Sequence, residues 1–336
     1  MRIAVFGAGS IGCLIGGSLL ARGNDVVLIG REQVGAEIAE YGLTVSDLEG
    51  RRETIPADKV PYSLTPDAVA GCDVILLTVK CTDTRNAAEE IARHAGKDTV
   101  IYSLQNGVGN TPILREVLKG YPVVAAMVAF NALWMGEGRF HRATDAGLVL
   151  GKHPASHQLA RLLKQSHIAT TIASDMQAVL WGKLCLNLNN AINVLSDLPL
   201  KRQLERRNYR RVLAACVEEA LAVMRAKNIE PAKIGKVSPK YIPSILNLPD
   251  PVFKLVAGSM MKMDDNARSS MWEDLQKGRE PEIDYLNGRI AEEGDRLKIA
   301  TPANAKITQL VKEAFAKGVS PKMSGQELLD AITPEV

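Results

Sequence analysis

The chain has 336 residues, of which 46% are apolar and 24% charged, and this length favours two globular domains. Its net charge of +3 and its aromatic content of 4% argue against a nucleic-acid partner. No apolar stretch reaches the roughly 18 residues that a membrane span needs, so we expect a cytoplasmic protein without a membrane partner.

The first half of the chain alternates short apolar runs with helical patterns, which is typical of βα units and of a parallel sheet covered on both faces. Strands are predicted at Ile3–Phe6, Val26–Ile29, Val74–Val79, Thr99–Ser103 and Val123–Phe130. Leu43–Ser46 and Glu53–Pro56 flank a polar turn and predict a small hairpin. Phe140 and Gly147–Leu150 predict a closing antiparallel pair at the sheet edge.

After about residue 172 the strand patterns cease, and helices separated by Pro-rich turns follow. This predicts a Rossmann-type α/β domain over residues 1–172 and an all-α C-terminal domain over residues 173–336. The first helix of the second domain is expected from about Asp175 to Leu195, with Asp175 at its N-cap.

Two features of the whole chain limit its partners. Its five cysteines lack a Cys-x-x-Cys pair, so neither a zinc site nor a disulfide framework is predicted, and no metal is expected. The basic run 201–211 is interpreted as a solvated helix face or a subunit contact, so a homodimer is among the assemblies we consider.

A glycine motif follows the first predicted strand and begins a helix, which is the context that dinucleotide binding requires. Its first glycine permits a tight turn, its second lets the backbone approach a pyrophosphate, and its third lets helix pack on strand. The helix N-terminus adds free N–H groups and a favourable dipole. A glycine-rich turn that only packs tightly is the structural alternative. Cofactor binding is therefore expected at Gly7, Ala8, Gly9, Ser10, Ile11 and Gly12.

Arg31 stands at the end of the second strand, where NAD-binding proteins carry an acid for the ribose 2′-hydroxyl. A guanidinium there can pair bidentately with a 2′-phosphate, which favours NADPH. The alternatives are a plain surface arginine, or Glu32 facing the ribose if the strand ends one residue later. Lys80 and the segment 105–107 follow two further strands at the same edge and are expected to line the cofactor site, although turn formation alone also explains them.

Three polar residues of the predicted helix in the second domain share one face: relative to Lys183, Asn187 lies at about +40° and Asn190 at about −20°, taking 100° per residue. Buried polar groups need partners, so this stripe favours a ligand site, and a solvent-facing helix is the alternative. Further on, Ser270 and Glu273 have capping-box spacing, which explains Ser270 without a ligand. The same helix N-terminus is also suited to a substrate carboxylate.

Together these motifs resemble the ketopantoate reductase (2-dehydropantoate 2-reductase) family over nearly the whole length of the chain. The resemblance also extends to the segments 268–271 and 282–288. It implies NADPH-dependent reduction of 2-dehydropantoate, a small 2-oxo acid, to (R)-pantoate, which is a step of pantothenate and coenzyme A biosynthesis.

The resemblance also implies roles for individual residues. Lys183 would be the general acid, Asn187 a substrate ligand and Ser270 a ligand of the substrate carboxylate. Glu282 would act in catalysis, near the substrate hydroxyl and the nicotinamide ribose, and so also contact the cofactor. Further cofactor contacts are implied for Lys80, Asn106 and Ala132.

The sequence departs from the family at one substrate position. Well-known members of the family carry a second asparagine eight positions after the lysine, where this chain has Ala191. Asn190, one place earlier, is expected to bind the substrate from the lysine face instead. The segment Pro239–Met263 is also longer than in compact members, so the exact 2-oxo acid stays open.

Other functions fit part of the pattern. A related 3-hydroxyacid dehydrogenase also pairs a lysine with an asparagine one helical turn on, but it usually carries a Gly-rich substrate loop that this sequence lacks. A non-catalytic NADP sensor would keep the glycine motif and Arg31, yet it has no reason to keep Lys183 together with Glu282.

Overall fold

The computed structural model describes residues 1–235, 237–258 and 265–333. The chain divides into two compact units, Met1–Met176 and Gln177–Val336. Part of the long segment noted in the sequence, residues 259–263, lies outside the described ranges. Within those ranges, no helix is long and apolar enough to cross a membrane.

The first unit contains two β-sheets. Its strands are β1 (Ile3–Phe6), β2 (Val26–Ile29), β3 (Leu43–Asp47), β4 (Arg52–Ile55), β5 (Tyr62–Ser63), β6 (Val74–Leu77), β7 (Val100–Ser103), β8 (Val123–Val128), β9 (Ala132–Trp134), β10 (Arg139–Arg142), β11 (Leu148–Gly151) and β12 (Thr170–Ala173). The larger sheet has the order β12-β11-β8-β7-β6-β1-β2-β5, and the smaller one has the order β4-β3-β10-β9.

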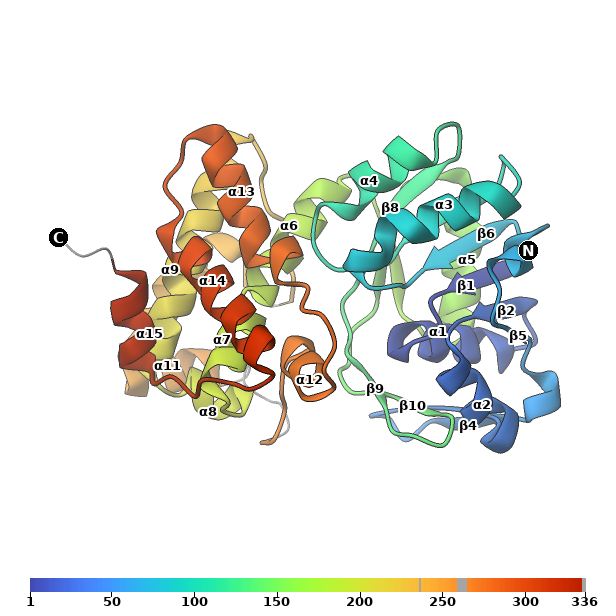
Figure 1. Ribbon diagram of the computed structural model, residues 1–336, viewed down its shortest axis with the longest axis horizontal. Coiled ribbons are helices and arrows are strands. Elements are labelled where there is room, and N and C mark those ends of the chain that lie inside the picture. The colour runs from blue at the N-terminus through green and yellow to red at the C-terminus, as the bar shows by residue number, and fades with distance from the viewer. Residues whose placement is uncertain (236, 259–264, 334–336) are drawn as a thin grey trace. The chain divides into compact units, whose positions relative to one another are not determined.

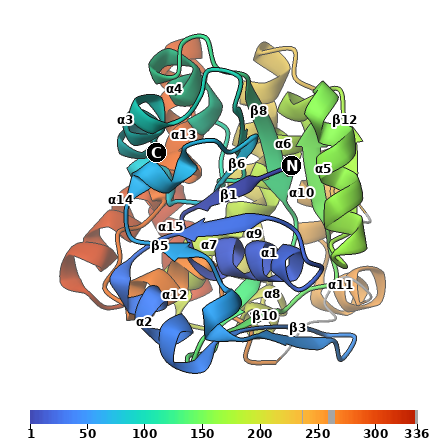
Figure 2. The same ribbon diagram turned by 90° about the vertical axis from the view of Figure 1, so that its right-hand side faces the viewer.

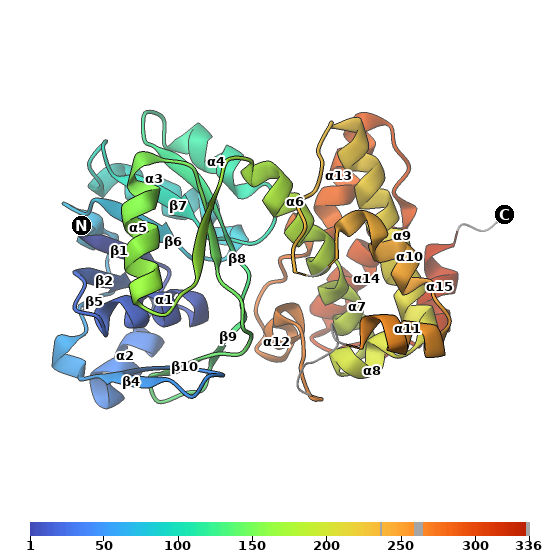
Figure 3. The same ribbon diagram turned by 180° about the vertical axis from the view of Figure 1, so that it is seen from behind.

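Helices cover the larger sheet on both faces. They are α1 (Ser10–Leu20), α2 (Glu32–Tyr41), α3 (Thr84–His94), α4 (Asn110–Val117) and α5 (Pro154–Gln165), with short 3₁₀ turns η1 (Ala57–Lys59), η2 (Pro66–Val69) and η3 (Cys81–Asp83). Ile3 and Val5 pack with α1 and α5, whereas Ala4 and Phe6 face α3 and α4. Figure 2 shows α3 and α4 on one side of β1 and α1 on the other, and Figure 3 shows α5. Burial on both faces explains why these strands read as continuous apolar runs.

The predicted hairpin is confirmed, because β3 and β4 pair antiparallel. The predicted pairing of Phe140 with Gly147–Leu150 is wrong. Phe140 lies in β10, which pairs antiparallel with β9 and parallel with β3, while β11 pairs antiparallel with β8 in the larger sheet. The cause is a tight turn before β10, where Gly136 and Gly138 have φ of +78° and +65°. A Cβ on Gly138 would lie 2.1 Å from the carbonyl oxygen of Gly42, so the turn also packs closely on the end of α2.

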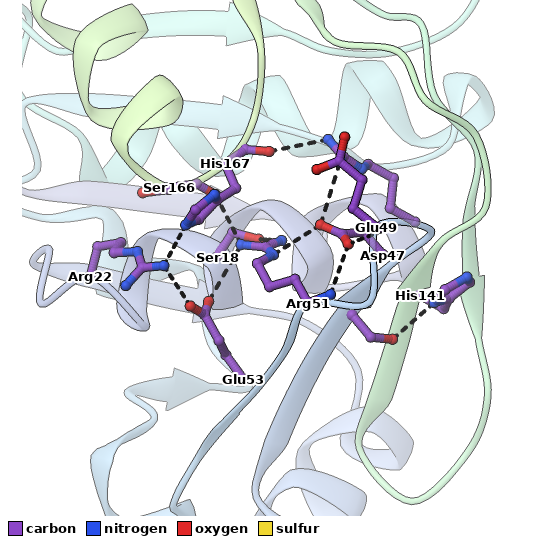
Figure 4. Close-up of polar contacts among 11 residues, drawn as sticks. Ser18, Arg22, Asp47, Glu49, Arg51, Glu53, His141, Ser166 and His167 are labelled. Carbon is purple, nitrogen blue, oxygen red and sulfur yellow. Dashed lines mark hydrogen bonds and ion pairs between the residues drawn. The ribbon is translucent and has the colours of Figure 1, made fainter.

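A buried charge cluster ties the hairpin to α1 and to the loop before β12 (Figure 4). The Arg51 guanidinium donates to Asp47 at 3.0 Å, to the Ser18 hydroxyl at 3.1 Å and to the Ser166 carbonyl at 3.1 Å. Arg142 lies 3.4 Å from the same aspartate. Burial alone would raise the pKa of Asp47, but the backbone N–H of Arg51 and the two guanidinium charges outweigh it and lower that pKa. We interpret this cluster as structural.

The second unit is helical. Its elements are α6 (Met176–Asn187), which starts at the last residue of the first unit, α7 (Asn189–Ser196), α8 (Leu200–Leu204), α9 (Arg207–Ala226), η4 (Pro239–Tyr241), α10 (Ile242–Leu246), α11 (Asp250–Ala257), α12 (Ser270–Gln276), η5 (Ile283–Tyr285), α13 (Asn287–Leu297), α14 (Pro302–Lys317) and α15 (Gly325–Ile332). The long helix α9 packs against α7, α10, α13, α14 and α15 (Figure 1). The predicted fold class, a Rossmann-type α/β domain followed by a helical domain, is confirmed.

One predicted helix is divided in two. The sequence predicts a single helix from about Asp175 to Leu195, but α6 ends at Asn187 and α7 begins at Asn189. Leu188 keeps helical dihedral angles, φ −57° and ψ −25°, and its N–H donates to the Leu184 carbonyl at 3.1 Å. The interruption is therefore mild, but a uniform 100° spacing no longer fixes where the residues after Leu188 point.

Candidate active site

The predicted cofactor residues of the first unit meet at one edge of the sheet. Strands β7, β6, β1 and β2 are neighbours and run parallel. Their last residues are in register, with Phe6 opposite both Ile29 and Leu77, and Leu77 opposite Ser103. Ligands bind at the carboxyl ends of the strands in such sheets. The residues that follow these four ends are the loop Gly7–Gly12, Arg31, Lys80 and Asn106.

The glycine loop has the geometry that a pyrophosphate needs. Gly7 has φ +111°, and a Cβ there would lie 2.6 Å from the backbone nitrogen of Val79. A Cβ on Gly12 would lie 2.4 Å from the carbonyl oxygen of Gly7, whereas a Cβ on Gly9 would meet nothing within 4 Å. Helix α1 begins at Ser10 with no side-chain cap and no acid in its first turn. Its first N–H groups thus point out of an uncapped N-terminus beside an open approach, which suits an anion.

Arg31 has a fixed backbone and an exposed side chain. The Tyr62 hydroxyl donates to the Arg31 carbonyl at 2.8 Å, and a Cβ on Gly30 would lie 2.4 Å from that hydroxyl. The Arg31 side chain is 83% exposed and lies 3.5 Å from an Asp83 carboxylate oxygen. Strand β2 ends before it at Ile29, and Glu32 is already the first residue of α2. Tyr62 and Asp83 were not predicted, since both contacts join segments that are distant in the sequence.

The other predicted cofactor residues differ in what they contact. Lys80 is half-buried and directly precedes η3. Gln105 is buried and donates to the Thr84 hydroxyl at 2.7 Å and to the Lys80 carbonyl at 3.4 Å, so it links two strand ends. Asn106 is half-buried beside it. Ala132 is the first residue of β9 in the smaller sheet and is half-buried.

Lys183 lies in α6, within the second unit. Its side chain is half-buried, and burial lowers the pKa of its ammonium. Among the described residues no carboxylate contributes to this shift. Next to it, Gly182 packs tightly, because a Cβ there would lie 2.3 Å from the Ala232 carbonyl oxygen. The helix therefore holds a poorly solvated cation on a closely packed backbone.

The asparagines after the lysine are not equivalent. Asn187, one turn on, is 9% exposed. Asn190 is half-buried, and Ala191 is fully buried in the core. The eighth position after Lys183 is thus a small core residue in this chain, and Asn190 is the polar side chain nearest to it in sequence.

The expected cap at Ser270 is wrong by one residue. The N-cap of α12 is Ser269, whose hydroxyl accepts from the Trp272 N–H at 3.2 Å. Ser269 is 4% exposed, whereas Ser270 is exposed. A cap residue needs extended dihedral angles before the first turn, and Ser269 has them, with φ −79° and ψ 156°, whereas Ser270 is already the first residue of the helix. The Ser270 hydroxyl therefore has no capping role.

A buried polar network holds this helix N-terminus against α7. Asn193, fully buried, accepts from the Ser269 N–H at 2.9 Å and donates to the Leu198 carbonyl at 2.7 Å and to Gln203 at 3.2 Å. Gln203 in turn donates to Asn189 at 2.6 Å. Asn193 was not predicted, although an asparagine among apolar helix residues indicates such a partnered group. The network fixes the backbone next to Ser270 relative to α7.

Glu282 directly precedes η5 and is 6% exposed. A buried carboxylate requires partners, and Glu282 has one. In the described part of the chain, no group of three or more His, Cys, Asp or Glu side chains is suited to hold a metal ion.

Both units match models of one protein family. The ketopantoate reductase PanE/ApbA model matches residues 3–155, and the ketopantoate reductase PanE/ApbA C-terminal model matches residues 175–315. A 2-dehydropantoate 2-reductase of Pyrococcus abyssi is 28% identical over 323 residues, which cover 93% of this chain and 97% of that protein.

Solved structures agree with this assignment. A PanE/ApbA family ketopantoate reductase from Ralstonia eutropha JMP134 is 31% identical, with a TM-score of 0.82 and coverage of 95% of this chain and 99% of that one. A D-mandelate dehydrogenase, solved with NADH and anilino(oxo)acetate, has the same fold at 23% identity, with a TM-score of 0.79 and coverage of 95% and 99%. The chain therefore belongs to the ketopantoate reductase PanE/ApbA family, whose members are oxidoreductases that use a nicotinamide dinucleotide.

Proposed function

We propose that the chain reduces 2-dehydropantoate to (R)-pantoate with NADPH, as a step of pantothenate and coenzyme A biosynthesis. The observation that carries this proposal is the half-buried ammonium of Lys183, whose pKa burial lowers, with the buried carboxamide of Asn187 one helical turn away. A cation that burial makes more acidic is well suited to give a proton to a developing alkoxide.

Reduction of a 2-oxo acid requires a hydride at C2 and a proton at the carbonyl oxygen. When bound, NADPH supplies the hydride from C4 of its nicotinamide. Lys183 donates a hydrogen bond to the carbonyl oxygen, stabilises the negative charge that grows there and transfers its proton to that oxygen. The neutral amine then regains a proton from solvent. Because the lysine is poorly solvated, its charge acts on the oxygen with little screening by water.

Four further polar side chains of the second unit orient the substrate. Ser270, exposed and without a capping role, donates to the substrate carboxylate beside the N-terminus of α12. Asn187 and Asn190 contact the hydroxyl end of the substrate. The carboxylate of Glu282 is proposed to orient the substrate hydroxyl and the nicotinamide ribose, a role in positioning more than in proton transfer.

NADPH, as opposed to NADH, is proposed because of Arg31. Arg31, whose guanidinium is exposed, follows β2 after Gly30, at the place where an NAD-selective protein would present a carboxylate. Glu32 is the weaker candidate for a ribose contact, since it already belongs to α2.

A second candidate function, reduction of another 2-oxo acid, is favoured by Ala191, which is fully buried where the family has its second substrate asparagine. NADPH oxidation should be compared with 2-dehydropantoate, with 2-oxoisovalerate, which lacks the hydroxymethyl group, and with phenylglyoxylate, the oxo acid of mandelate. We expect kcat/KM for 2-dehydropantoate to exceed that of the others by about tenfold or more, because polar groups left unpaired by the wrong substrate discriminate strongly. An equal or higher value for either competitor would assign the site to that acid.

Two adjacent serines separate substrate binding from helix capping. Ser270→Ala should raise KM for the 2-oxo acid by about tenfold, the effect of losing one hydrogen bond to a charged group, with little change in melting temperature. Ser269→Ala is the matched control, and it should lower stability by about 1 kcal/mol through loss of the cap. Steady-state kinetics and thermal unfolding of both variants check this. A Ser270→Ala variant that loses stability and keeps its KM would remove Ser270 from the substrate site.

A further inference from the structure

Asp83 forms an ion pair with the arginine that we assign to the cofactor. Its carboxylate oxygen lies 3.5 Å from the Arg31 guanidinium, and its side chain is 43% exposed. The two residues come from opposite sides of β1, since Arg31 follows β2 and Asp83 ends η3 after β6. Neighbouring strands lie about 4.8 Å apart, so the ends of β2 and β6 are roughly 10 Å apart, and the side chains meet across the end of β1. The pair thus lies beside the start of the Gly7–Gly12 loop.

Asp83 stands where an aspartate commonly caps a helix, but its side chain does not cap this one. Asp83 is the N-cap residue of α3, where an aspartate commonly accepts hydrogen bonds from the first helical N–H groups. Here its side chain makes no such bond. The carboxylate is instead paired with Arg31, although an ion pair between two exposed side chains contributes little stability. The placement of this charge therefore matters more for what binds Arg31 than for the fold.

A 2′-phosphate that binds Arg31 enters the field of this carboxylate. Phosphate and carboxylate are both anions, and they would share one guanidinium at a separation of a few ångströms, where like charges repel. NADH carries a neutral hydroxyl at the same place, so the repulsion acts on NADPH alone. We propose that Asp83 is a specificity-determining residue for the cofactor, which competes with the 2′-phosphate for Arg31 and lowers the preference for NADPH over NADH.

This inference rests on the proposed role of Arg31, and binding measurements on the full chain separate the two. The dissociation constants of NADPH and NADH are measured for the wild-type chain, for Asp83→Asn and for Arg31→Ala. Asp83→Asn should tighten NADPH by about three- to tenfold at low salt, the range expected for removal of one exposed charge next to a phosphate, and leave NADH within about twofold. High salt should shrink the gain, because the two charges are exposed.

Glu90→Gln is the matched control. It also removes one negative charge, and it breaks a comparable exposed ion pair, that of Glu90 with Arg93. Glu90 lies seven residues after Asp83, which places it roughly 10 Å from Asp83 along the axis of α3. At about 0.15 M salt the ratio of the two dissociation constants should stay at its wild-type value in this variant, because the Debye length there is about 8 Å and exposed charges farther apart than this are largely screened.

The outcomes test the role of Arg31 and the role of Asp83 separately. If Arg31→Ala leaves the ratio unchanged, the proposed role of Arg31 fails. If Arg31→Ala weakens NADPH but Asp83→Asn leaves the ratio unchanged or weakens NADPH, then Asp83 does not compete with the phosphate, and the inference alone is overturned. It is also overturned if the ratio rises only because NADH binds more weakly, since Asp83 would then be a ligand of the ribose hydroxyl.

Discussion

Replacing Lys183 with alanine is expected to lower kcat for the 2-oxo acid by a factor of about 10²–10⁴, the usual range for loss of a general acid. The fold should tolerate the change, because the half-buried ammonium is held at an energetic cost that its lowered pKa reflects. Steady-state kinetics with thermal unfolding check both parts. Near-normal turnover in a folded Lys183→Ala chain would remove the basis of the proposed mechanism.

Two further variants sharpen this result. Lys183→Arg keeps a positive charge but gives up a proton far less readily, so it should lose nearly as much activity as alanine. Lys227→Met is the matched control, since Lys227 is another partly buried lysine of the second unit and pairs with Glu293 at 2.6 Å. This control should lose stability, because it leaves a buried carboxylate with fewer partners, and keep kcat.

The pH dependence of the reaction rate also follows from Lys183. The reaction needs Lys183 protonated, and burial lowers its pKa from the ordinary value of 10.5. The rate should therefore fall as pH rises through a pKa below 10.5, and this limb should disappear in Lys183→Arg. The pH dependence of the free energy of unfolding has the opposite sign. The charged lysine is disfavoured in the fold, so its cost is present at low pH and is relieved as pH rises from the lowered pKa toward the unfolded value.

Reversing the charge at Arg31 is expected to change the cofactor preference by about a hundredfold. Arg31→Asp removes a charged hydrogen-bond donor from the 2′-phosphate and places a second carboxylate beside Asp83, so NADPH should weaken strongly while NADH is relatively favoured. The KM ratio of the two cofactors is the measurement.

Arg93→Asp gives the control for this variant, since it reverses an exposed arginine on α3 far from the strand ends. It should leave the KM ratio near its wild-type value. An unchanged ratio in Arg31→Asp as well would show that Glu32 or another residue sets the preference.

Local patterns predicted most of the first unit. Strands β1 and β2 have the predicted bounds, and the glycine loop lies between β1 and α1 as expected. These elements are encoded by short runs with their own turn signals. The pairing of β10 was not predicted, because it depends on the turn at Gly136–Gly138 and on a parallel neighbour nearly a hundred residues earlier.

Within the candidate site, the kinds of residue were easier to predict from the sequence than the exact position at which each one acts. Spacing identified a capped helix near Ser270, but the choice between two adjacent serines depends on backbone dihedral angles. The partners of Arg31 and of Ser269 come from distant segments, through Asp83 and Asn193, and no local pattern encodes such contacts. The break at Leu188 likewise has no breaker residue to announce it.

Deuterium transfer tests the central claim most directly. The wild-type chain is incubated with 2-dehydropantoate and NADPH that carries deuterium in place of both hydrogens at C4, and the product is analysed by mass spectrometry and NMR. We predict (R)-pantoate with one deuterium at C2 for each NADPH oxidised. Pantoate without deuterium, or no oxidation of NADPH with 2-dehydropantoate or any other 2-oxo acid, would contradict the account.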